Sequence, residues 1–110
     1  MYTYKPIVKR VIDGDTFVCD IDLGFNITVQ NKSVRVAHVN APEKYTPEGK
    51  IAKEYTESML AQGDVTLTII DHRGDKYGRL LAEVHIGGRR LDKAMIEDGH
   101  GNPYEGGTKE

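Results

Sequence analysis

The sequence predicts a small antiparallel β-barrel of five strands that carries two helices. The length of 110 residues, with 38% apolar and 29% charged residues, is ordinary for one globular domain. Apolar residues alternate with a period of two in five short segments, and helical patterns follow only the third and the fifth of them. We therefore expect a single domain over residues 1–110, with its core at about 5–101 and a flexible tail at 102–110.

The first two strands are predicted to form a hairpin. The β-branched segment 6–12 precedes Asp13-Gly14, a dipeptide typical of hairpin turns because glycine tolerates the positive φ that such turns require. The second strand, 16–23, places Cys19 on the same face as Phe17. Cys19 is the only cysteine, which excludes an intramolecular disulfide, and we expect a buried, inert thiol because no cation is adjacent to it.

Residues 27–29 are expected either to extend a strand or to form a short strand of their own, and residues 33–39 are predicted as the third main strand. Alternation places Val34, Val36 and His38 on one face of this strand. The other face carries Arg35, Ala37 and Val39. We expect His38 to be a partly buried histidine with a hydrogen-bond partner, because no second His or Cys lies at the spacing of metal ligands.

A helix is predicted to begin at Thr46-Pro47-Glu48, where Thr46 can cap free N–H groups and Pro47 fits the first turn. It ends at Gly63, and its apolar stripe should pack on the sheet. The stripe comprises Ile51, Ala52, Tyr55, Met59 and Leu60.

Strands over 65–69 and 80–86 follow this helix, and a short helix over 91–98 comes next. We expect Asp92 to cap the short helix, and the chain to fray beyond Gly99. The residues of this helix expected to face inward are Leu91, Ala94 and Met95. Five strands with a helix between the third and the fourth match the OB type of barrel.

Charge and composition restrict the partners. The net charge of −2 argues against broad, tight binding of nucleic acid, so any polyanion must be held locally. No apolar run is long enough to cross a bilayer, and the first residues lead directly into a strand pattern. We expect a cytoplasmic monomer with no membrane partner, with secretion still open if a leader was removed before this numbering.

Three polar clusters stand out, and each has an ordinary structural explanation when it is taken alone. Asp13 and Asp15 flank a glycine, as in many hairpins; Arg35 lies within a strand and could form a structural salt bridge; Glu43 could be a surface carboxylate. The segment 75–79 gathers two cations and a tyrosine at a turn. Together, guanidinium forks and carboxylates favour phosphate chemistry.

These clusters resemble a known family. Val11-Ile12-Asp13-Gly14-Asp15-Thr16, then Val34-Arg35-Val36 with Val39-Asn40-Ala41-Pro42-Glu43, and finally Asp75-Lys76-Tyr77-Gly78-Arg79 are similar to three motifs of the staphylococcal nuclease (thermonuclease) family, in the same order. The resemblance covers about residues 7 to 101, and the segment 91–99 resembles the helix that follows the barrel in that family.

The resemblance implies a calcium-dependent nuclease on an OB-type barrel that cleaves DNA and RNA with little sequence preference and leaves 3′-phosphate ends. Asp15 would be a metal carboxylate, Arg35 and Arg79 would clamp phosphate, and Glu43 would position or deprotonate the attacking water. The other matched residues would have supporting roles: Asn40 and the Ala41 carbonyl as metal ligands, Lys76 and Tyr77 as phosphate contacts, and Asp13 and Thr16 behind the metal ligands.

The sequence departs from the family at Asn40, where members commonly carry an aspartate. An amide oxygen can coordinate calcium but brings no charge, so we expect weaker calcium binding. The leading hypothesis is a nuclease acting on single-stranded or locally frayed nucleic acid. The alternative is a catalytically silent OB module that binds nucleic acid or another protein; Arg35, Glu43 and Arg79 count against this alternative.

Overall fold

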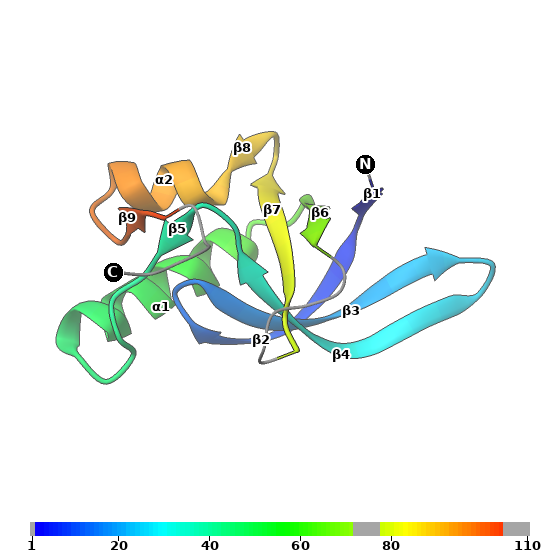
Figure 1. Ribbon diagram of the computed structural model, residues 1–110, viewed down its shortest axis with the longest axis horizontal. Coiled ribbons are helices and arrows are strands. Elements are labelled where there is room, and N and C mark those ends of the chain that lie inside the picture. Colours follow the sequence, from blue (N-terminus) through cyan, green and yellow to red (C-terminus); the bar gives the residue numbers. More distant parts are fainter. Residues whose placement is uncertain (1, 72–77, 105–110) are drawn as a thin grey trace.

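The computed structural model describes residues 2–71 and 78–104, which form a strongly curled sheet with two helices (Figure 1). The strands are β1 (Tyr2–Tyr4), β2 (Pro6–Asp13), β3 (Thr16–Gly24), β4 (Ile27–Val36), β5 (Val39–Asn40), β6 (Val65–Asp71), β7 (Leu80–Ile86), β8 (Arg89–Arg90) and β9 (Asn102–Pro103). The helices are α1 (Pro47–Leu60) and α2 (Leu91–Glu97).

The main sheet has the strand order β1-β6-β7-β4-β3-β2, and β8 pairs with β7. Its two end strands, β1 and β2, are consecutive in the chain and are separated only by Lys5, so the sheet curls back on itself. The ring of strand pairs is not closed within the described residues, yet the arrangement is that of an OB-like fold, as predicted. One pairing corrects the expected antiparallel barrel, because β4 and β7 run parallel over Val34–Val36 and Leu80–Ala82.

The core lies between the inner face of the sheet and the two helices. Its largest fully buried side chains are Phe17, Leu67, Leu91 and Met95. Cys19 is also fully buried, and burial raises the pKa of its thiol to about 12, which confirms the prediction of an inert thiol.

Strands β3 and β4 continue beyond the rest of the sheet as a two-stranded arm (Figure 1). Residues 27–29 extend a strand, as one of the two predicted options, but the expected break at residues 30–32 is wrong because β4 is one continuous strand from Ile27. The arm ends in the turn Phe25-Asn26, where both residues have positive φ (56° and 62°), and Phe25 is 95% exposed.

The inner end of β4 also differs from the prediction. The strand stops at Val36 because His38 adopts a positive φ of 73°, and the chain turns before β5. This turn sends Val39 into the core. The His38 Nε2 atom lies 3.1 Å from a Glu83 carboxylate oxygen, so His38 is a partly buried histidine with a partner, as predicted.

Helix α1 begins as predicted, because the Thr46 hydroxyl accepts a hydrogen bond from the Gly49 N–H at 2.9 Å. The prediction that Ile51 lies on the packed stripe is wrong: it is 54% exposed, and Thr56 is buried on that face instead. Neither described helix has the length and apolar character that a membrane crossing requires.

Helix α2 and the segment after it correct two further expectations. Asp92 does not cap α2, since the N-cap is Arg90 and the buried Asp92 carboxylate accepts two hydrogen bonds from the Arg90 guanidinium. The predicted inward residues are fully buried: Leu91, Ala94 and Met95. The chain does not fray directly after Gly99, because β9 pairs with β5 and the Tyr104 N–H donates to the His38 carbonyl.

Candidate active site

The site is built on the turn between β2 and β3, which contains Gly14. The Thr56 hydroxyl on α1 donates a hydrogen bond to the Gly14 carbonyl at 2.7 Å, within the protein interior. A Cβ atom at Gly14 would come within 2.9 Å of the Ala41 Cβ and 3.0 Å of the Ala52 Cβ, so only glycine fits. Helix α1 therefore fixes the turn that carries Asp13 and Asp15.

The Asp15 carboxylate is the most enclosed polar group of the site, with 7% of the residue exposed. Its Oδ2 atom accepts the Ala41 N–H at 2.9 Å and lies 3.5 Å from Arg35 Nη1, while Oδ1 accepts the Thr16 hydroxyl at 3.1 Å. Burial acts to raise the pKa of Asp15, but the hydrogen bond from Asp13, the Arg35 charge and the other two donors together lower it below its ordinary value. Asp15 is therefore held ionised.

Asp13 lies beside Asp15, and its pKa is shifted in the opposite direction. The Asp13 Oδ1 atom accepts the Asp15 N–H at 3.3 Å. Burial, followed by the hydrogen bond and the negative charge of Asp15, raises the pKa of Asp13 to about 6. Two carboxyl groups thus lie together at the rim of the sheet, and Asp13 is the one that holds a proton more readily.

The Arg35 guanidinium is fixed by backbone and side-chain oxygens. Nη1 donates to the Val36 and Val39 carbonyls, both at 2.8 Å, and Nη2 donates to Asn40 Oδ1 at 3.2 Å. The Tyr104 ring packs against the guanidinium, with its centroid 5.6 Å from Cζ. Within the described residues, the Nε–H and one Nη2–H of Arg35 remain without a protein acceptor, so they are available to a ligand.

The second arginine, Arg79, is linked to Asp15 through the Thr16 hydroxyl. Parallel pairing sets Arg35 opposite Leu81, which places Arg79, two residues earlier, near the start of β3. Arg79 Nη1 donates to the Thr16 hydroxyl at 3.4 Å, and Thr16 donates in turn to Asp15. The structure thus brings Arg35 and Arg79 to the same carboxylate, the second through a hydroxyl.

The remaining predicted residues are placed less tightly. Glu43 is exposed, and within the described part of the chain its carboxylate has no hydrogen bond or ion pair. Its backbone is fixed, because its carbonyl accepts the Thr46 N–H at 3.0 Å and the Thr46 hydroxyl at 2.7 Å. The predicted phosphate contacts Lys76 and Tyr77 lie outside the described residues.

Three contributors to the site were missed from the sequence. The Ala41 N–H binds Asp15, whereas the sequence suggested only a role for the Ala41 carbonyl. Tyr104 was assigned to a tail, and no sequence signal indicates that it packs on Arg35. Thr56 could have been found, because it is a polar residue one turn after Ala52, within the packed face of α1.

The oxygen donors of the site suit a hard cation. No group of three His, Cys, Asp or Glu side chains suited to a metal occurs among residues 2–71 and 78–104. The side-chain oxygens that lie around Arg35 belong to the Asp15 carboxylate and the Asn40 amide, with Asp13 beside Asp15. An all-oxygen set of this kind fits calcium, which accepts water and phosphate oxygens at its other positions. Two adjacent carboxyl groups are also an arrangement that a cation would stabilise.

Comparison with known proteins agrees with the family resemblance of the sequence motifs. A family profile described as "Staphylococcal nuclease homologue" matches residues 33–109. The thermonuclease of Staphylococcus intermedius is 35% identical over 99 residues, which is 84% of this chain and 55% of that protein. Endonuclease YhcR of Bacillus subtilis is 33% identical over 92% of this chain but only 9% of its own length.

An uncharacterized endonuclease of Escherichia coli is 33% identical over 89% of this chain and 60% of its own length. The chain therefore spans little more than half of the thermonuclease and of the Escherichia coli protein. The family profile covers most of the chain, including Arg35, Glu43 and Arg79. The chain belongs to the staphylococcal nuclease homologue family.

Proposed function

We propose that this chain is a calcium-dependent nuclease that hydrolyses phosphodiester bonds of single-stranded or frayed DNA or RNA and leaves 3′-phosphate ends. The observation that carries the proposal is the ionised, enclosed Asp15 carboxylate, which lies beside Arg35 and is joined to Arg79 through Thr16. The relatives named thermonuclease and endonuclease support hydrolysis of nucleic acid as the reaction.

Each residue has a defined task in this reaction. Calcium, when bound by Asp15 and Asn40 with the Ala41 carbonyl, would supply positive charge beside the phosphate oxygens. Arg35 has donors left for phosphate, and Arg79 is linked to Asp15 through the Thr16 hydroxyl. Two guanidinium groups stabilise the charge that grows on the equatorial oxygens during attack.

Glu43 is the proposed base. Its carboxylate is solvent-exposed and has no competing partner among the described residues, so it can accept a proton from an attacking water. The water oxygen bonds to phosphorus while the bond from phosphorus to the 5′ oxygen breaks. The 5′ oxygen leaves as a hydroxyl with a proton from solvent, and the phosphate stays on the 3′ oxygen of the upstream fragment.

A second candidate function is binding without hydrolysis, and the position of Asn40 favours it. The Asn40 Oδ1 atom accepts a hydrogen bond from Arg35, so the amide oxygen is already engaged by the protein. Asn40 also contributes no charge to a calcium site. A protein with a weakened metal site could still bind nucleic acid through its arginines.

One experiment separates the two functions. Single-stranded DNA and RNA are incubated with the protein in calcium or in chelator, with Glu43→Gln as the test variant and Glu54→Gln, on the exposed face of α1, as its control. We expect cleavage only in calcium, a loss on the order of 100-fold in Glu43→Gln, and none in Glu54→Gln. The absence of calcium-dependent cleavage, or equal activity of both variants, would contradict the nuclease proposal.

The Asn40→Asp variant tests the metal site in the same assay. A carboxylate at this position would add a charged calcium ligand next to Arg35, so we expect half-maximal activity at a lower calcium concentration. An unchanged or higher calcium requirement would show that Asn40 is not a metal ligand.

A further inference from the structure

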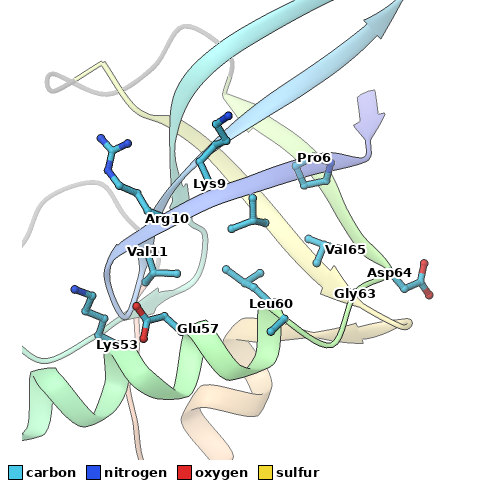
Figure 2. Close-up of a pocket in the computed structure, with 12 residues that line it drawn as sticks. Pro6, Lys9, Arg10, Val11, Lys53, Glu57, Leu60, Gly63, Asp64 and Val65 are labelled. Carbon is cyan, nitrogen blue, oxygen red and sulfur yellow. The ribbon is translucent and has the colours of Figure 1, made fainter.

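A groove lies between β2, the second half of α1 and the segment 63–65, outside the proposed active site (Figure 2). Its volume is about 740 Å³. Apolar side chains line it from both elements, among them Val8 and Val11 from β2 and Leu60 from α1. Charged side chains stand at its margin, with Arg10, Lys53 and Glu57 at the same end as Val11 and with Asp64 at the other end.

Positive and negative side chains are distributed unevenly along this groove. Lys9 pairs with Asp20 at 3.6 Å, and Asp64 pairs with Lys5 at 3.5 Å, so these two groove residues are compensated. Among residues 2–71 and 78–104, Arg10 and Lys53 have no ion-pair partner, and Glu57 is the acid that stands with them. The end that holds Arg10 and Lys53 therefore carries an excess of positive charge.

This basic end adjoins the turn that carries Asp15. Arg10 precedes Asp13 by three residues in the same strand, a distance of about 10 Å at the rise of a β-strand. Lys53 follows Ala52, which packs against Gly14, and lies one turn before Thr56, which binds the Gly14 carbonyl. A strand of nucleic acid held at Asp15 would therefore reach the groove within about three phosphates.

We propose that the β2–α1 groove binds the substrate strand two or three nucleotides from the cleaved bond, with backbone phosphates at Arg10 and Lys53. Sugar and base edges would pack on Val8 and on the small exposed surfaces of Val11 and Leu60. This inference rests on the proposed nuclease function and explains how a chain with net charge −2 holds a polyanion locally. Two cations and an apolar floor suit a single strand, whose bases are free to make apolar contacts.

The test measures binding in chelator, so that no cleavage occurs. Labelled single-stranded oligonucleotides of about 3 and about 12 residues are titrated with the wild type and with the double variant Arg10→Gln/Lys53→Gln. The matched control is Lys32→Gln/Lys93→Gln, which removes the same charge from β4 and α2. Inorganic phosphate serves as a third probe.

We expect the groove variant to bind the long oligonucleotide on the order of tenfold more weakly, and the slope of log affinity against log salt to fall by about 1.4, since each phosphate contact contributes about 0.7. The short oligonucleotide, inorganic phosphate and the control variant should be nearly unaffected. Equal weakening of both oligonucleotides, loss of inorganic phosphate binding alone, or an equal effect of the control would each overturn the groove proposal.

The two proposals fail in different ways. Calcium-dependent cleavage by a protein whose binding of long strands is insensitive to Arg10 and Lys53 would overturn the groove and leave the nuclease function intact. Length-dependent binding that requires Arg10 and Lys53, without any cleavage, would overturn hydrolysis and support the groove.

Discussion

The two ends of the β3–β4 strand pair differ in which side chains are buried. Polar groups are enclosed at the inner end, and apolar side chains are exposed at the outer end. At the inner end, Thr16 pairs with Arg35, and polar groups are enclosed by α1, β7 and the turn before β5. At the outer end, Gly24 pairs with Ile27, and Phe25 and Ile27 are exposed to solvent. The same two strands therefore supply a rigid frame for the site and an arm that the core does not support. Substitutions at the inner end should change both stability and chemistry, whereas those in the arm should change little.

The largest effect is expected from Arg35→Gln. This change leaves the Asp15 carboxylate enclosed without its cation and removes the hydrogen bonds to the Val36 and Val39 carbonyls. Breaking such a pair costs about 3 kcal/mol of unfolding free energy, and loss of a phosphate donor lowers the rate on the order of 100-fold. Urea unfolding and cleavage rates measure the two effects.

The control for Arg35→Gln is Arg89→Gln, which breaks an exposed ion pair with Glu97. Exposed pairs contribute less than about 1 kcal/mol. If both variants lose equal stability, the enclosed arginine is no more important to the fold than a surface arginine, and the contrast between the two ends does not hold.

A smaller loss is expected from Thr56→Val, which supports the inner end from helix α1. Valine keeps the shape of the fully buried side chain but leaves the Gly14 carbonyl without its donor, at a cost of about 1–3 kcal/mol. Activity should also fall, because the turn that carries Asp15 loses its attachment to α1. Thr56→Ser, which retains the hydroxyl, should keep most of the activity; equal activity in the serine and valine variants would contradict a positioning role.

Asp13→Asn should change how stability depends on pH. The pKa of Asp13 is raised to about 6, so the folded state binds this proton more tightly than the unfolded state does. The stability contributed by the protonated form is complete below the ordinary value of 3.8 and is lost as pH rises through about 6. Asparagine stays neutral, so the variant should exceed the wild type in stability at pH 8, and the difference should shrink between pH 6 and 4.

Asp15→Asn should change the pH dependence of stability in the opposite direction. The same unfolding measurements, made in chelator, test this. The pKa of Asp15 is lowered, so its ionised form contributes stability that is lost as pH falls. This variant should be less stable than the wild type at neutral pH and should approach it in acid. Differences that stay constant with pH in both variants would show that the two carboxyl groups titrate alike in the folded and unfolded states.

The smallest effect is expected at the outer end, from Phe25→Asn. Phe25 has a φ of 56° in a two-residue turn, a conformation that asparagine adopts more readily than a bulky residue. The variant should gain up to about 1 kcal/mol of unfolding free energy, with no change in cleavage. A loss of stability on urea unfolding would show that the exposed ring makes contacts that stabilise the arm.

Most of the fold could be predicted from local patterns. Alternating apolar residues in β6 and β7, and the Thr46-Pro47 start of α1, reflect preferences that neighbouring residues determine. The continuous β4 was missed because Gln30, Asn31 and Lys32 are polar, and an arm without a core behind it does not require apolar alternation. The stop at Val36 was missed because the run from Val34 to Val39 has strong strand propensity, which tertiary packing overrides.

The site could be predicted as a set of residues but not as a set of contacts. The sequence indicates that Asp15, Arg35 and Arg79 converge, and in the structure Arg35 lies beside the Asp15 carboxylate while Arg79 reaches it through the Thr16 hydroxyl. That Asn40 faces Arg35, and that Tyr104 packs on the same guanidinium, depends on the turn at His38 and on the pairing of β9 with β5. No short sequence pattern encodes contacts between segments so far apart in the chain.

Cys19 lies between the two ends of the strand pair, opposite Lys32, and is fully buried with a pKa raised to about 12. A thiol reagent can therefore reach it only when the strands separate. Because Cys19 is the only cysteine, its labelling rate reports how often these strands separate. Labelling of the Phe25→Asn and Thr56→Val variants would show whether the arm and the inner end of the strand pair open independently or as one cooperative unit.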